Sequence, residues 1–148
     1  AVSLVKRGAG TLTLTNEMDR GTTTSGGVTV KAGTLTVAGD YGSLGTACTN
    51  ITVEGTGTLA LEGASASMLS DDATVRLAPA GAGSAKISLA AGIDETVGWF
   101  FFGGEPMYPG TYGATGSGAE YVDDTRFAGN GVLRVLHGKA KGTLIRVH

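Results

Sequence analysis

The sequence predicts an all-β chain that coils into a short parallel β-solenoid of about four or five rungs and ends in an aromatic cap. Three observations support this prediction. Apolar residues alternate with small polar ones, Gly occupies 26 of the 148 positions, and two short phrases recur with a common period. Alternation and β-branched residues favour strands over helices. A fixed period in the low twenties is typical of solenoid coils.

The first repeated phrase is a Gly-Thr-Leu motif that ends on a second aliphatic residue. It occurs at residues 10–14, 33–37 and 57–61. Leu12 and Leu35 are 23 residues apart, and Leu59 follows 24 residues later. Each occurrence is short enough to form one strand of a coil.

The second phrase alternates in the same way and keeps step with the first. It occurs at residues 3–5, 28–30, 51–53 and 75–77. Successive copies are 24, 23 and 24 residues apart, measured between Leu4, Val28, Ile51 and Val75. Two strand series with one period predict two strands in each coil.

Stacking of equivalent residues would build the core of such a solenoid. Each Leu or Val would lie over its equivalent at the strand spacing of about 4.8 Å, while Thr side chains form outer columns. Gly10, Gly33 and Gly57 would form corners that need unusual dihedral angles or close approach between rungs. Residues 22–24 and 45–48 are candidates for a third face.

The sequence fits a single domain of residues 1–148, with repeat rungs in 1–96 and an aromatic cap with terminal strands in 97–148. Eleven basic and 13 acidic residues give a net charge of −2, which offers no overall basis for nucleic-acid binding. The longest strongly apolar run, residues 97–102, is too short to span a membrane. Since the chain begins in a strand-like pattern without Met, we expect a module of a longer protein.

Eight of the nine aromatic residues lie between residues 97 and 127, where the period breaks. A solenoid must cover its unpaired rung edges and open core, so a cap is the simplest explanation. Residues 100–102 and 108–112 are expected to pair around a turn at 103–104. Further strands are expected at 132–135 and 143–147.

Several segments resemble a known repeat family. Residues 10–14, 21–24 and 28–37 resemble the autotransporter-associated β-strand repeat. Residues 109–113 and 127–135 are similar to the closing segments that follow such repeats in large secreted bacterial proteins. These resemblances imply a right-handed parallel β-helix and an exported parent protein.

The chain also resembles carbohydrate-binding module family eighty-nine in its short solenoid, its module-sized length and its aromatic segment. Members of that family are small parallel β-helices attached to secreted xylan-degrading enzymes. This resemblance implies that the chain binds xylan or a related plant cell-wall polysaccharide. It also implies a partner, namely an attached glycoside hydrolase that the module keeps near its substrate.

Sugar binding requires aromatic faces for pyranose C–H surfaces and polar groups for the hydroxyls. The candidate carbohydrate-binding residues are Trp99, Tyr108, Tyr112, Tyr121, Glu105 and Asp123. We expect Tyr108 to form the exposed platform and Tyr112 to be buried. Packing in the core or the cap is the competing explanation for Trp99, and a flat Thr-rich sheet face is an alternative platform.

No catalytic, metal or cofactor site is expected. The acidic pairs at residues 71–72, 94–95 and 123–124 are adjacent, so strand geometry would point their members to opposite faces. The lone Cys48 is expected to be a buried apolar residue. The main alternative function is that of a structural spacer or adhesin passenger segment without a small ligand.

Overall fold

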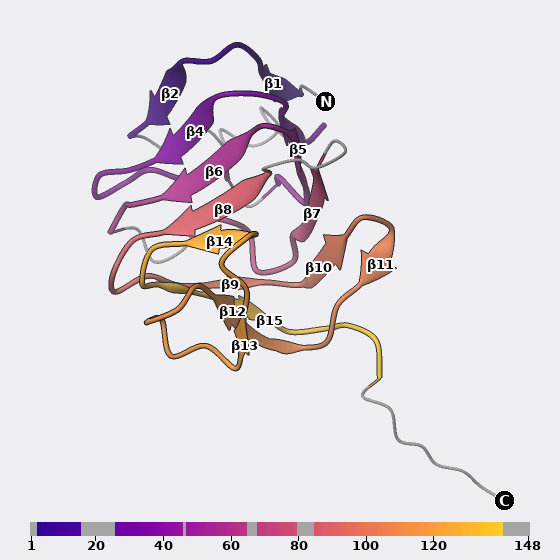
Figure 1. The fold of residues 1–148 in the computed structure, drawn as a ribbon. Helices are drawn as coiled ribbons and strands as arrows, with labels where there is room; N and C mark the ends of the chain where they lie inside the picture. Colours follow the sequence, from indigo (N-terminus) through magenta and orange to yellow (C-terminus); the bar gives the residue numbers. More distant parts are fainter. Residues whose placement is uncertain (1–2, 16–25, 46, 65–67, 80–84, 141–148) are drawn as a thin grey trace, which may run out of the picture.

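A computed structural model describes residues 3–15, 26–45, 47–64, 68–79 and 85–140. Within these ranges the chain forms strands and no helix, and the strands build three sheets. Two of the sheets are the faces of a solenoid, and the third closes one end of it (Figure 1). The predicted all-β solenoid is confirmed.

The first face contains the second repeated phrase. Its order is β1-β3-β5-β7-β10-β11, in which the first five strands are parallel and the last pair is antiparallel. The strands are β1 (Leu4–Lys6), β3 (Val28–Val30), β5 (Asn50–Gly55), β7 (Thr74–Pro79), β10 (Trp99–Phe102) and β11 (Glu105–Pro106).

The second face contains the Gly-Thr-Leu phrase. Its order is β14-β8-β6-β4-β2, and every neighbouring pair is parallel. The strands are β2 (Thr11–Leu14), β4 (Thr34–Val37), β6 (Thr58–Leu61), β8 (Lys86–Leu89) and β14 (Phe127–Ala128).

Equivalent residues of successive coils are direct partners, as the period predicts. Leu12 pairs with Leu35, Leu35 with Leu59, and Leu59 with Ile87. Leu35 and Leu59 are fully buried. About three regular turns separate Leu4 from its equivalent Val75 on β7. Beyond these turns, β10 adds a fifth strand to the first face and β14 adds a fifth strand to the second face.

The stacking continues beyond the point where the sequence period breaks. Phe100 pairs with Val75, and Phe127 pairs with Ile87. Both phenylalanines are buried, and their rings contact edge-on with centroids 5.6 Å apart. Two residues of the predicted cap therefore form the last layer of the solenoid core.

The third sheet contains the predicted strand at residues 132–135 as β15, but the sequence did not predict the partners of this strand. Its order is β13-β12-β15-β9, where β12 is antiparallel to β15. The strands are β9 (Asp94–Val97), β12 (Gly110–Gly113), β13 (Tyr121–Val122) and β15 (Val132–Val135). The expected pairing of residues 100–102 with 108–112 is wrong, because the tight turn pairs β10 with β11 and leaves β12 for β15. The predicted strand at 143–147 lies outside the described residues.

Loops close the third side of the middle coils, and β9 lies on that side in the next coil. Leu44, Cys48 and Met68 are buried there, and the Leu44 amide donates to the Met68 carbonyl at 2.9 Å. Residues 45, 47 and 48 form no strand. The other candidate for this face, residues 22–24, lies outside the described part of the chain.

The corner glycines are not equivalent. Gly33 has a φ of +67°, and a Cβ there would collide with the carbonyl oxygens of Gly8 and Gly10. A Cβ on Gly57 would lie 2.6 Å from the Val30 carbonyl oxygen, whereas one on Gly10 would meet nothing within 4 Å. The predicted constraint therefore holds at the second and third corners and is absent at the first.

Candidate functional site

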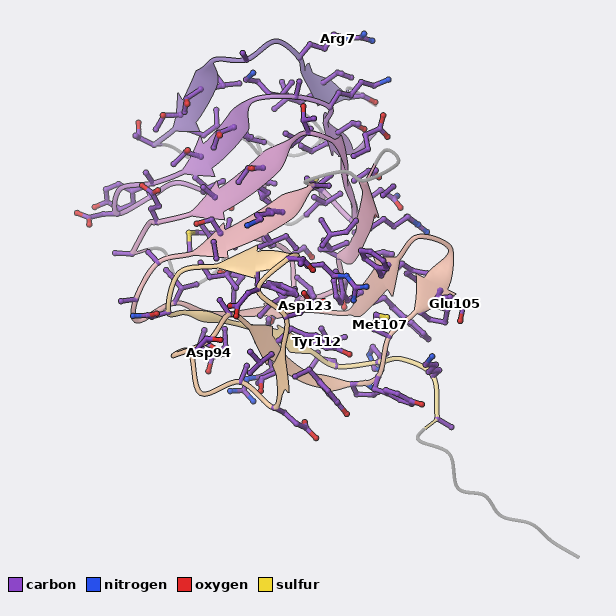
Figure 2. All side chains as sticks on the ribbon, viewed as in Figure 1. Arg7, Asp94, Glu105, Met107, Tyr112 and Asp123 are labelled. Carbon is purple, nitrogen blue, oxygen red and sulfur yellow. The ribbon has the colours of Figure 1, made fainter. Side chains whose placement is uncertain are left out.

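The structure divides the predicted sugar-binding residues among three places. Four of them line one pocket below the last solenoid layer: Tyr108, Tyr112, Tyr121 and Asp123. Trp99 lies on the outer face of β10, and Glu105 lies at the tip of the β10–β11 hairpin, away from Tyr112 and Asp123 (Figure 2).

The tyrosine pocket has a volume of about 280 Å³. Its lining is mainly aromatic and aliphatic, and consists of Met107, Tyr108, Tyr112, Tyr121, Val122, Asp123, Arg126 and Phe127. Strands β12 and β13 position Tyr112 and Tyr121 as direct partners. The pocket therefore lies where the third sheet covers the solenoid core.

Ring stacking explains why these tyrosines gather. The rings of Tyr112 and Tyr121 are 4.9 Å apart, and those of Tyr108 and Tyr121 are 6.3 Å apart. The Tyr112 hydroxyl donates to the Tyr108 carbonyl oxygen at 2.7 Å. Tyr112 is buried, as expected, and its ring packs edge-on against Phe100 at 5.2 Å. The stack extends the solenoid core and acts as its cap.

Tyr108 differs from the exposed platform that the sequence suggested. It is half-buried, and the ammonium group of Lys139 lies 4.9 Å from its ring centroid. Stacking on Tyr121 occupies one side of the ring. This ring therefore offers less open surface to a ligand than a residue in a protruding loop would.

The polar rim of the tyrosine pocket is an ion pair. The Asp123 carboxylate lies 3.0 Å from the Arg126 guanidinium and accepts hydrogen bonds from the Thr125 amide and hydroxyl. The Arg126 guanidinium carbon lies 3.2 Å from the Phe102 ring centroid, a cation–π contact. Asp123 is thus held by its own loop and by Arg126.

Trp99 occupies a different environment, on the outer surface of the first face. Strand alternation points Phe100 into the core and Trp99 and Phe101 outward, and Trp99 is 37% exposed. The Trp99 ring lies 6.2 Å from the Phe101 ring and 5.9 Å from the His137 ring. The Arg76 guanidinium lies over Phe101 at 5.1 Å. Core packing therefore does not account for Trp99.

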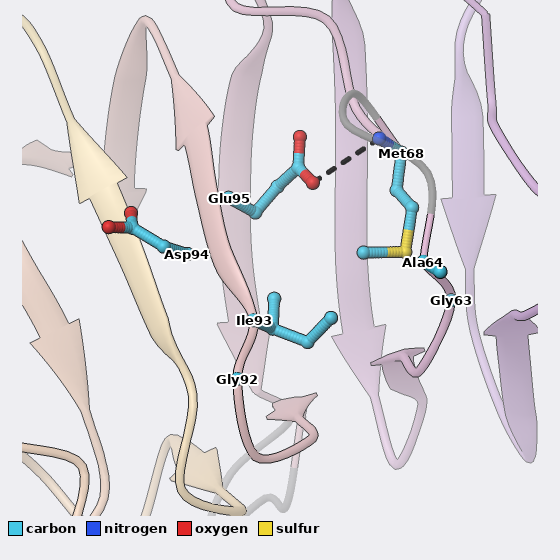
Figure 3. Close-up of a pocket in the computed structure, with 7 residues that line it drawn as sticks. All are labelled: Gly63, Ala64, Met68, Gly92, Ile93, Asp94 and Glu95. Carbon is cyan, nitrogen blue, oxygen red and sulfur yellow. Dashed lines mark hydrogen bonds between the residues drawn. The ribbon is translucent and has the colours of Figure 1, made fainter. Parts of the chain in front are cut away.

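Sequence reasoning missed a buried carboxylate on the third side of the solenoid. Glu95 is 2% exposed, and one carboxylate oxygen accepts a hydrogen bond from the Met68 amide at 3.2 Å (Figure 3). The other oxygen accepts one from the Leu69 amide at 3.1 Å. The carboxylate therefore joins two coils where no strand pairing does so. One sequence signal could have indicated this burial. Glu95 lies two residues before the apolar Val97, and strand alternation points the side chains of Glu95 and Val97 to the same, buried face.

Burial raises the pKa of Glu95 to about 7, and the negative charges of Asp71 and Asp94 add to this effect. The two backbone hydrogen bonds act in the opposite direction. Glu95 borders a hollow of about 250 Å³ that is lined by Gly63, Ala64, Met68, Gly92, Ile93, Asp94 and Glu95. A perturbed acid beside a hollow is a general marker of functional sites.

The geometry assigns Glu95 a structural role instead. Asp94, its neighbour, is exposed and forms a two-point ion pair with Arg134 at 2.7 and 3.1 Å. Both residues border the hollow, but their carboxylates point in different directions (Figure 3), and that of Asp94 is held by Arg134. Among the described residues, no group of three or more His, Cys, Asp or Glu side chains is placed to hold a metal ion.

Comparison with known proteins gives one family match. Residues 4–37 match the passenger-associated transport repeat, and this range contains β1 to β4, the paired strands of the first two coils. No curated protein and no solved structure matches the chain. The repeat resemblance is thus supported, while the resemblance to carbohydrate-binding module family eighty-nine stays a prediction. No helix in the described ranges is long and apolar enough to cross a membrane.

Proposed function

We propose that this chain is a noncatalytic β-solenoid segment in the passenger region of a large secreted bacterial protein. The family match supports this proposal, because it names a passenger-associated repeat and covers the paired strands of the first two coils. The same strand pair recurs in β5 with β6 and in β7 with β8. An extracellular location follows from the passenger assignment.

The observation that favours a segment of a longer stack is the contrast between the two ends of the core. At the first coil Leu12 is 38% exposed although its partner Leu35 is fully buried. At the other end, Phe100, Phe127 and Tyr112 cover the same core. An open apolar end accepts a further coil, whereas a capped end terminates the stack.

Surface display tests this proposal. The chain would replace the passenger stem in front of an autotransporter translocation unit, and a compact helical domain of similar size would serve as control. We expect the chain to reach the cell surface in folded form, detected by antibody labelling of intact cells and resistance to added protease. Retention inside the cell, with normal export of the control, would refute the passenger assignment.

Polysaccharide binding is the second candidate function, with xylan as the expected ligand. The observation that favours it is the exposed Trp99 ring on the outer face of a sheet. In this role the module would hold an attached glycoside hydrolase near the plant cell wall. Affinity electrophoresis against soluble xylan, β-glucan and pectin tests it: slower migration in xylan is expected, and unchanged migration in all three would exclude it.

A further inference from the structure

We infer that the glycan-binding surface is the outer face of β5, β7 and β10 around Trp99, and that its ligand is an internal stretch of an extended, β-linked polysaccharide. This inference rests on the proposed polysaccharide binding and specifies its site and ligand class. The tyrosine pocket then serves as a cap and not as the binding site.

The register of the strands builds two outward columns on this face. The first column runs from Asn50 through Thr74 to Trp99. The second column runs through Thr52, Arg76 and Phe101. Strands β5, β7 and β10 follow one another down the side of the solenoid (Figure 1). An aromatic ring thus ends a row of amide and hydroxyl groups.

The polar groups of this face are placed beside the ring. Arg76 lies over Phe101 and donates to the Asn50 side-chain oxygen at 3.5 Å, so its guanidinium extends across the face. The His137 ring lies 5.9 Å from the Trp99 ring, and the His137 backbone amide donates to the Gly98 carbonyl at 2.8 Å. Sugar recognition needs this combination of an exposed ring with nearby donors and acceptors.

The spacing of the columns indicates the ligand class. Parallel strands repeat about every 4.8 Å, which is close to the length of one sugar in an extended β-linked chain. A glycan that crosses β5, β7 and β10 would therefore place successive sugars at Asn50, Thr74 and Trp99. A coiled α-linked chain would lose this register after one contact.

The shape of the two sites separates them. The outer face is a sheet surface that extends from Trp99 on β10 across β7 and β5 toward β3 and β1, so a chain can lie along it without entering a pocket. The tyrosine pocket, at about 280 Å³, has room for about one sugar ring and would select a chain end. Ring stacking within the pocket already covers the faces of Tyr112 and Tyr121.

Affinity electrophoresis with variants of the whole chain tests the inference. Trp99→Ala should abolish retardation by xylan, and Asn50→Ala, at an exposed position, should weaken it several-fold. Tyr108→Ala should leave it unchanged. Tyr41→Ala is the matched control for loss of an exposed aromatic residue, because Tyr41 is 73% exposed and lies in a loop. Thermal melting would verify that each variant is folded.

Oligosaccharide length provides an independent readout in the unmodified chain. Affinity should rise steeply from the disaccharide to the tetrasaccharide, whereas a one-sugar pocket would show little gain. Retardation that survives Trp99→Ala and Asn50→Ala but is lost in Tyr108→Ala would overturn the inference and leave polysaccharide binding intact. If no glycan retards the unmodified chain, both the inferred binding site and the proposed polysaccharide binding are wrong.

Discussion

Leu12 and Leu35 are direct partners on adjacent parallel strands, yet one is 38% exposed and the other is fully buried. They share a position in the repeat and a side-chain type. The difference arises because β4 lies between two strands, whereas β2 is the edge strand of this face among the described residues. Burial in this chain depends on the rung as well as on the residue.

Leucine truncation measures this difference. Leu35→Ala should lower the free energy of unfolding by about 2–5 kcal/mol, because it leaves a cavity between two coils. Leu12→Ala should cost only about 1–2 kcal/mol, since much of its side chain already contacts solvent. Urea denaturation of both variants provides the comparison. Equal losses would show that the first coil is covered in solution.

The corner glycines provide a second test. Gly33→Ala should cost on the order of 2 kcal/mol or more, because it combines a left-handed φ with a collision against two carbonyl oxygens. Gly10→Ala is the matched control in the same repeat position and should change stability by less than about 0.5 kcal/mol. Thermal melts would show the difference. A large loss in both variants would contradict the corner geometry.

Glu95 should make the stability of the fold depend on pH. Its pKa is about 7 in the folded chain, above the ordinary value of 4.5, so the folded state holds the proton more tightly than the unfolded state. Its contribution to stability is therefore complete below pH 4.5 and declines as the pH rises to 7, by no more than about 3 kcal/mol.

Two variants isolate this effect in urea denaturation between pH 4.5 and 8. Glu95→Gln should remove the decline, because the amide does not titrate. Glu62→Gln, which changes an exposed carboxyl group, should preserve it. A decline that persists in Glu95→Gln would assign the pH dependence to other groups.

Duplication of one coil should lengthen the solenoid without disrupting it. A second copy of residues 27–49 adds one 23-residue period. Each aliphatic residue of the added coil can then stack on the equivalent residue of the neighbouring coils. The variant should unfold cooperatively at an equal or higher temperature. A copy of residues 27–38, about half a period, should lower the melting temperature sharply. Similar losses in the two variants would argue against the coil as the structural unit.

The sequence was sufficient to predict the two stacked faces, because the spacing of the two repeated phrases, whose first copies contain Leu4 and Leu12, determines which strands are partners and in which register. It was insufficient for the second face beyond residue 97. Phe100 follows its partner by 25 residues, which is close to the period, but Phe127 follows its partner by 40 residues. No period connects positions at such unequal separations. The third sheet was missed for the same reason, as β9 and β15 are far apart in sequence.

The sequence indicated which aromatic residues could form the candidate site, but it did not indicate how the strands arrange them in space. Alternation along residues 99–102 indicates that Trp99 and Phe100 face opposite sides, but it does not tell which side is the core. The gathering of Tyr112 and Tyr121 depends on the pairing of β12 with β13, which leaves no periodic trace. Glu95 was overlooked because an acidic residue in a polar segment ordinarily faces solvent.

The register of the aliphatic columns is the central claim, and methyl–methyl nuclear Overhauser spectroscopy tests it most directly. In a chain labelled at Leu and Ile methyl groups, Leu59 should show cross-peaks to both Leu35 and Ile87. Leu35 and Ile87 should show none to each other, because a whole coil separates them. Absence of the two Leu59 cross-peaks in the folded chain would contradict the solenoid and the surfaces built on it.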